Sequence, residues 1–123
     1  RGILMSYHEP YENLSPAARE AHRALLSLIE ELQAVDWYNQ RADQATNDEL
    51  KKILVHNRDE EIEHAAMCLE WLRREMPEID EALRTYLFTE KSIVALEEAD
   101  TGGQGDVGTG SLNIGKFRKG AEQ

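Results

Sequence analysis

The first 100 residues almost lack the residues that interrupt helices. No glycine lies between Gly2 and Gly102, whereas seven of the eight glycines fall between Gly102 and Gly120, and the whole chain has only three prolines. Because glycine and proline mark turns and loops, this distribution predicts an ordered body that ends near residue 100, followed by a tail of different character. A chain of 123 residues is long enough for one small domain.

Cysteine and long apolar stretches are also scarce. The one cysteine, Cys68, cannot form a disulfide within the chain, and its position on an apolar helix face predicts a buried, unreactive thiol. No apolar run approaches the roughly 20 residues that span a bilayer, and no basic start leads into an apolar segment as in a signal peptide. We therefore expect a soluble protein in the cytoplasm.

Basic residues are outnumbered by acidic ones. The sequence has 14 lysine and arginine residues against 24 aspartate and glutamate residues, a formal net charge of −10. The tail from Thr101 has three basic and two acidic residues and contributes +1, which leaves −11 on residues 1–100. A body this acidic repels nucleic acids and anionic membranes and attracts metal cations, so neither nucleic acid nor membrane is an expected partner.

Two long helices are predicted. Ser15 is a candidate N-cap with Pro16 at the first helical position, and about 30 residues without glycine or proline follow. A short turn, with Asp48 as a plausible cap, leads into a second helix from about residue 49 to 75, which stops before Pro77. Helices joined by so short a turn must fold back as an antiparallel hairpin.

A third, shorter helix is expected from about residue 79 to 99, with a possible break near residues 89–92. Its buried face is predicted to comprise Leu83, Tyr86 and Leu87. Because no strand pattern with turn signals is present, the predicted fold class is all-α: an antiparallel two-helix hairpin plus a short C-terminal helix. The expected parts are an N-terminal extension (1–14), a helical domain (15–99), a Gly-rich linker (100–110) and a C-terminal peptide (111–123).

Polar residues interrupt the apolar stripe of the second helix. Apolar side chains recur at helical spacing toward both ends of this helix, at Leu50, Ile53, Leu54, Cys68, Trp71 and Leu72. Continued through the middle, the stripe falls on Asn57, Glu61 and His64, which we therefore expect to face inward. Glu60 lies beside this seam, and its facing is ambiguous.

The first helix has a similar interruption and a wide apolar surface. One apolar row is interrupted by Glu31, three residues after Leu28 and four before Val35. A second row runs beside it and consists of Leu25, Ile29, Leu32 and Asp36. Together the two rows exceed what packing against one partner helix requires, so the helix is expected to contact another chain.

Inward-facing ionisable groups need partners, because a buried carboxylate without one is strongly destabilising. One interpretation is a buried ion pair between Glu31 and protonated His64, bridged by Asn57. The other is a metal site, in which Glu61-x-x-His64 offers a carboxylate and an imidazole one turn apart and Glu31 adds an oxygen ligand from the facing helix. Di-iron sites in helix bundles take one glutamate from each of two helices and a Glu-x-x-His from each of the other two.

This chain supplies half of that ligand list. Two copies related by a two-fold axis would complete it, with Glu31, Glu61 and His64 of each chain around two metals in a four-helix bundle made from two hairpins. Mixed carboxylate and imidazole ligation suits iron, manganese or zinc, and the pattern does not choose among them. Tyr38, on the row of Glu31, could donate a hydrogen bond to a ligand carboxylate.

Several segments of this sequence resemble the encapsulated ferritins. AVDWY (34–38) together with HNRDEE.EHAAM (56–67) is a specific signature of that family. The matching segments cover most of the first 90 residues and are HEP (8–10), HRALLSLIEELQAVDWYNQR (22–41), HNRDEEIEHAAMCLEWLRRE (56–75) and LRTYLFTE (83–90). The segment GSLNIGKFRKG (110–120) is similar to the peptides that dock such cargo inside encapsulin shells.

The resemblance implies a ferroxidase that oxidises Fe²⁺ to Fe³⁺ with O₂. By this resemblance Glu31, Glu61 and His64 are the ligands of a di-iron centre shared across a dimer, with two irons per dimer and with Tyr38 and Trp37 close to them. Zinc, manganese or calcium are the expected substitutes for iron.

The resemblance also implies an assembly and a location. Five dimers would form a ring inside an encapsulin nanocompartment in the cytoplasm, and the surrounding shell rather than the ring would store the mineral. Members of the family usually carry a metal-attracting pair of glutamates on the first helix. Here Glu30 matches, but the second position is Gln33, so only Glu30 is carried over as a metal-binding residue.

The tail fits a docking role on its own chemistry as well. Its Gly-rich residues predict a flexible tether. Three spaced apolar residues, Leu112, Ile114 and Phe117, are candidate anchors for a groove and are flanked by basic residues. A plain disordered terminus has little use for such anchors, so residues 111–120 are expected to bind an encapsulin shell protein, with avidity from many tails on one ring.

Two other classes of function remain open from the sequence. One is a metal-free structural hairpin dimer, in which the inward polar residues fix the register. The other is a different di-metal enzyme on the same bundle, such as a manganese catalase or a rubrerythrin-like peroxidase, although the Cys-x-x-Cys domain usual in rubrerythrins is absent. A cage ferritin is disfavoured because two of its long helices are missing. His22 and His56 are expected at the surface or edge rather than as ligands.

Overall fold

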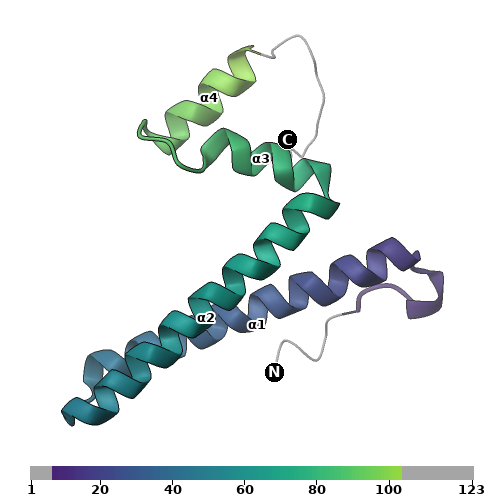
Figure 1. Cartoon of the computed structure of the whole chain (residues 1–123). Helices are drawn as coiled ribbons and strands as arrows, with labels where there is room; N and C mark the ends of the chain where they lie inside the picture. The colour runs from purple at the N-terminus through teal and green to yellow at the C-terminus, as the bar shows by residue number, and fades with distance from the viewer. Residues whose placement is uncertain (1–6, 104–123) are drawn as a thin grey trace. The chain divides into compact units, whose positions relative to one another are not determined.

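The computed structural model describes residues 7–103, with side chains through residue 99, and its regular elements in that range are all helical (Figure 1). In chain order these are a short 3-10 helix η2 (Tyr11–Asn13), α1 (Pro16–Gln44), α2 (Asp48–Glu75), α3 (Pro77–Tyr86) and α4 (Ile93–Gly103). The all-α prediction is confirmed. The predicted C-terminal peptide, 111–123, lies outside the described residues. None of the described helices combines the length and the apolar character needed to cross a membrane.

The chain divides into two compact units, Arg1–Glu75 and Met76–Gln123. In the first unit α1 and α2 lie side by side as a hairpin, joined by the short turn that the sequence predicts (Figure 1). The helices have 29 and 28 residues, so the hairpin extends roughly 40 Å. The second unit contains α3 and α4.

Side-chain caps fix where the two long helices begin. The Ser15 hydroxyl accepts a hydrogen bond of 3.0 Å from the backbone N–H of Ala18, as the sequence predicts for an N-cap. At α2 the cap is Asn47, whose Oδ1 accepts from the N–H of Leu50 at 2.9 Å. The prediction of Asp48 as the cap is therefore wrong by one residue. Asp48 is the first helical residue, where its negative charge favours the helix N-terminus.

The N-terminal extension is anchored to α1 through aromatic and guanidinium contacts. Arg19 donates to the carbonyl oxygen of Tyr11 from Nε at 3.2 Å and from Nη2 at 2.8 Å, and its guanidinium lies over the Tyr11 ring. The ring of Tyr7 packs on that of His22, with centroids 4.2 Å apart. His22, expected at the surface or edge, is thus a half-buried packing residue.

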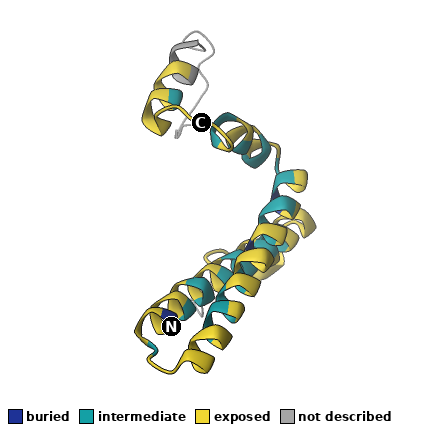
Figure 2. Cartoon of the chain, turned by 60° about the vertical axis from the view of Figure 1, so that its left-hand side comes forward, coloured by how far each residue is buried: buried dark blue, intermediate teal, exposed yellow. Residues whose placement is uncertain are grey.

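The hairpin buries few side chains completely. Only Ala42, Ala65 and Leu72 are buried among the described apolar residues. Cys68, expected to be buried, is half-buried. Figure 2 shows that exposed positions recur along both helices. Many of the exposed residues on this unit are large and apolar: Leu25, Ile29, Leu32, Trp37, Leu50, Ile53, Ile62, Met67 and Trp71.

The exposed residues of α1 include the second apolar row predicted from its sequence. Leu25 is 39%, Ile29 48% and Leu32 53% exposed, because α2 covers only the neighbouring row. Leu50 and Ile53 of α2 are also exposed, although the sequence placed them on the inward stripe, whereas Leu72 on the same stripe is fully buried. Exposed apolar surface of this kind is typical of a protein interface.

The second unit shows the break in the third helix that the sequence indicated. α3 ends at Tyr86, whose carbonyl accepts a hydrogen bond of 2.8 Å from Thr89 Oγ1, and Ser92 Oγ accepts from the N–H of Ala95 to begin α4. Phe88, between these caps, has φ 60° and is fully exposed. Leu87 is exposed rather than buried as predicted, because the helix has already ended at its position.

Candidate metal centre

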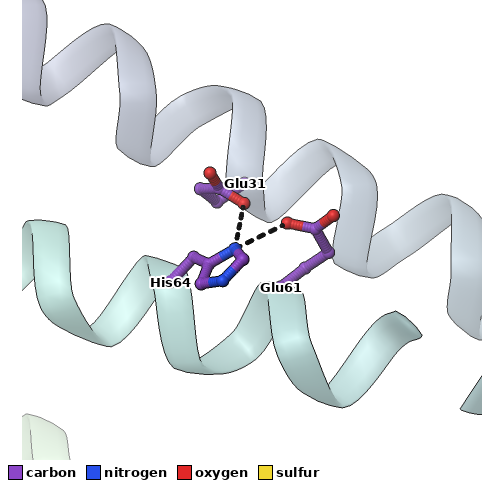
Figure 3. Close-up of side chains that lie close together, drawn as sticks. All are labelled: Glu31, Glu61 and His64. Atoms are coloured by element: carbon purple, nitrogen blue, oxygen red, sulfur yellow. Dashed lines mark hydrogen bonds and ion pairs between the residues drawn. The ribbon is translucent and has the colours of Figure 1, made fainter. Parts of the chain in front are cut away.

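The three predicted ligands meet at the middle of the hairpin. Glu31 comes from α1, and Glu61 and His64 come from α2, one turn apart (Figure 3). His64 Nδ1 lies 3.6 Å from Glu31 Oε1 and 3.4 Å from Glu61 Oε1. One ligand atom from each residue can be chosen so that all three lie within 4.8 Å of one another. The structure thus brings together the residues that helical periodicity selected.

Residues 7–99 do not enclose the centre. The side chain of His64 is 47% exposed, and those of Glu31 and Glu61 are 27% and 26% exposed. The prediction that these residues face inward therefore holds only in part: they lie along the α1–α2 seam, on a face that neither helix covers. The described part of one chain offers two carboxylates and one imidazole in this cluster, too few to surround two metal ions.

Other predicted residues lie outside this cluster. Glu30 is exposed and does not join the group of candidate ligands found among residues 7–99. Tyr38 is half-buried, and its ring lies 5.3 Å from the guanidinium carbon of Arg41. Trp37 is 51% exposed. In the described part of the chain Asn57 makes no hydrogen bond to the cluster, so the predicted bridge is not observed.

One neighbour of the cluster was left ambiguous by the sequence. Glu60 Oε1 lies 3.9 Å from His64 Nε2, and its other oxygen lies 3.9 Å from His56 Nε2. The two imidazole nitrogens of His64 therefore face different carboxylates. Glu60 lies four residues from His56 and four from His64, so the sequence allows an ion pair with either. Helical spacing alone does not decide which way a side chain beside the seam turns.

The charges in the cluster shift its proton affinities. A shared hydrogen bond with Glu61, together with partial removal from water, raises the pKa of Glu31 above its ordinary value, and His64 only partly opposes this effect. Partial removal from water acts to lower the pKa of His64. The hydrogen bond to Glu61 and the negative charges of Glu31, Glu61 and Glu60 outweigh it, so the pKa of His64 is raised. The site favours a bound positive charge.

Comparison with known proteins identifies the family. The profile of the EncFtn-like family matches residues 6–90. The chain belongs to the EncFtn-like family. The encapsulated ferritin-like protein of Rhodospirillum rubrum is 54% identical in a match that covers 92% of this chain and 88% of that protein. The ferritin-like protein of Thermotoga maritima is 56% identical over 111 residues, which cover 90% of this chain and 96% of that protein.

A solved structure extends this likeness to the fold. A protein of Nitrosomonas europaea with a known crystal structure is 59% identical to this chain. The two structures match with a TM-score of 0.69, over 71% of this chain and 96% of that chain. The family match spans α1, α2 and α3, and therefore includes all three residues of the cluster in this EncFtn-like chain.

The raised pKa of His64 leads to a testable dependence on Glu61. In the metal-free protein, protonated His64 contributes stability below its unfolded pKa, and this contribution is lost as the pH rises through the folded pKa. We expect an NMR titration of the imidazole to give a pKa above the ordinary histidine value, and Glu61→Gln to lower it. Glu63→Gln, a neighbouring exposed change outside the cluster, should leave it unaltered. An unshifted pKa in the unsubstituted protein would contradict the described geometry.

Proposed function

We propose that this EncFtn-like protein is a ferroxidase that oxidises Fe²⁺ to Fe³⁺ with O₂ at a di-iron centre shared by two chains. The observation that carries the proposal is the cluster of Glu31, Glu61 and His64, held within 4.8 Å on an uncovered face of the hairpin. The names of its relatives, ferritin-like and encapsulated ferritin-like, support iron handling.

A second copy supplies what one chain lacks. Two hairpins facing each other across a two-fold axis form a four-helix bundle with one glutamate from each of two helices and a Glu-x-x-His from each of the other two. The same contact covers exposed apolar side chains of α1 such as Leu25, Ile29 and Leu32. One association thus explains both the half-complete ligand set and the uncovered apolar row. A ring of five such dimers is the assembly that the family resemblance implies.

The charges of such a dimer suit two Fe²⁺ ions as substrate. Four ionised carboxylates carry −4 and two Fe²⁺ ions carry +4, so binding neutralises the site. Each Fe²⁺ would then lose one electron, and one O₂ molecule would gain both electrons with two protons from solvent and leave as hydrogen peroxide. The carboxylates accommodate the change in charge and radius by changing how they bind, and no protein nucleophile is required. Glu31 and His64 bind metal only in their deprotonated forms, so their raised pKa values make metal binding weaken as the pH falls.

We also propose that the protein is encapsulin cargo, docked through residues 111–120. The support is the spacing of Leu112, Ile114 and Phe117 among basic residues, together with the name of the Rhodospirillum rubrum relative. This proposal places the protein inside a cytoplasmic nanocompartment, where the shell would store the oxidised iron.

A metal-free polar network is the alternative that a specific observation favours. His64 lies at ion-pair distance from both Glu31 and Glu61, so a protonated imidazole can balance their charge without a metal. In that case the centre would fix the register of a structural dimer and would show no metal-dependent chemistry.

Iron oxidation separates these two functions. We expect the natural protein to oxidise a first increment of about one Fe²⁺ per chain at least about tenfold faster than the Glu31→Ala, Glu61→Ala, His64→Ala triple variant. Aerobic oxidation followed optically at rising iron-to-chain ratios measures the increment.

A matched control holds the number of removed charges constant. Glu49→Ala, Glu81→Ala and His8→Ala together remove two glutamates and one histidine outside the cluster, and this variant should retain the fast increment. If the natural protein only matches protein-free buffer, the ferroxidase proposal fails and the polar network remains.

A substitution on the uncovered row tests whether the site is shared. Leu32→Glu places a charge on a side chain that is 53% exposed in one chain but buried in the proposed dimer. We expect it to abolish association in sedimentation analysis and to slow iron oxidation at least about tenfold at equal chain concentration.

The control for that experiment is Ala17→Glu, an exposed position in the first turn of α1, which should affect neither readout. Circular dichroism establishes that the helices persist in both variants. Full activity from a monomeric Leu32→Glu protein would mean that one chain suffices.

Deletion of residues 111–120 tests the cargo proposal independently of iron chemistry. We expect the shortened chain to lose co-purification with a co-expressed encapsulin shell, because its anchors are gone, while its rate of iron oxidation in solution stays unchanged. A shortened chain that is still packaged would assign docking to another part of the protein.

A further inference from the structure

The second unit carries an apolar surface that the proposed iron chemistry does not use. A hollow of about 340 Å³ lies between α3 and α4 and is lined by Tyr86, Ile93, Val94 and Glu97. Ile93 and Val94 are 67% and 63% exposed, although they are branched apolar residues on a short helix. Neither residue belongs to the apolar face predicted from helical periodicity, and α3 alone does not cover them.

The surroundings of this hollow are acidic. Residues 76–99 contain six acidic and two basic residues. Glu97 lies in the wall of the hollow, and the carboxylates of Glu90 and Glu98 are exposed on the same unit. An apolar hollow with acidic neighbours suits an extended segment that carries apolar anchors among basic residues.

The same chain contains a segment of that chemistry. Residues 111–120 include three apolar side chains, at Leu112, Ile114 and Phe117, and three basic residues with no acidic one. The charge is therefore opposite to that of residues 76–99. The basic residues are Lys116, Arg118 and Lys119.

The chain between the hollow and residues 111–120 is of suitable length for the two to meet. Eight residues separate Gly103, the last of α4, from Leu112. A glycine-rich chain of that length has a root-mean-square span of roughly 16 Å. The return path along α4 from Gly103 to Val94 is roughly 14 Å at 1.5 Å per residue. A tether whose span matches the separation gives an effective concentration in the millimolar range, at which even weak contacts are populated.

We propose that the hollow between α3 and α4 is a docking site for the chain's own residues 111–119. The apolar anchors would occupy the surface around Ile93 and Val94, and the basic residues would lie against Glu97 and its acidic neighbours. Residues 111–119 would then be covered by α3 and α4 in the free protein. A groove on a shell protein would have to compete with the hollow for these residues. This inference does not depend on the iron chemistry, and it holds whether or not the tail also binds a shell.

Hydrogen exchange on the full-length protein, without any shell protein, tests this contact. We expect the amides of residues 111–119 to exchange at least about threefold more slowly than in an Ile93→Ser, Val94→Ser variant, which corresponds to a tail docked about two thirds of the time. Glu97→Lys, which keeps the apolar residues, should also speed exchange of the tail. Raising the salt concentration to about 1 M should weaken the protection by screening the charges.

The matched control is Ala95→Ser, an exposed change on the same helix that does not line the hollow. It should leave the tail as protected as in the natural protein. Equal exchange of the tail in the natural protein and in the Ile93→Ser, Val94→Ser variant would overturn the proposal. Protection that disappears on tenfold dilution would also overturn it, because it would assign the hollow to the tail of a second copy. Neither outcome would bear on the ferroxidase proposal.

Discussion

Two antiparallel helices cover only one side of each other, so a hairpin leaves most of its helix surface to solvent or to another chain. In this protein α1 is apolar on two adjacent rows, and α2 covers one of them. The uncovered row, with Leu25, Ile29 and Leu32, borders the seam that contains Glu31. In the proposed dimer, the burial of that row and the completion of the ligand set would therefore both depend on the same contact between two chains.

The negative charges of Glu31, Glu61 and Glu60 favour the binding of a cation at the centre. Glu31 and Glu61 both face one nitrogen of His64. Hydrogen bonding with Glu61 raises the pKa of Glu31, and partial removal from water and repulsion by the negative charge of Glu61 add to this effect. A proton on His64 or a bound metal relieves that repulsion. The ion pair of the metal-free chain and the proposed iron site are thus alternative ways of balancing the same charge. Metal binding must displace protons, which couples affinity to pH.

The long helices could be predicted because their signals are local. Ser15 caps α1 as expected, no glycine or proline interrupts either helix, and the break after α3 falls close to residues 89–92. Two of the errors concern the ends of helices. Asn47 rather than Asp48 caps α2, since either side chain could serve and the backbone geometry decides. Leu87 was assigned to a buried face, but the chain leaves the helix one residue before it.

The sequence by itself determined the helices, the acidic body and the choice of Glu31, Glu61 and His64, because periodicity places residues on a helix face without reference to distant contacts. Only the tertiary structure decided how those residues meet. It brings both carboxylates to one nitrogen of His64, turns Glu60 toward the other, leaves Asn57 out and keeps the centre part-exposed. These details depend on how two helices pack and on which side chains a second helix covers, and a one-dimensional pattern contains neither.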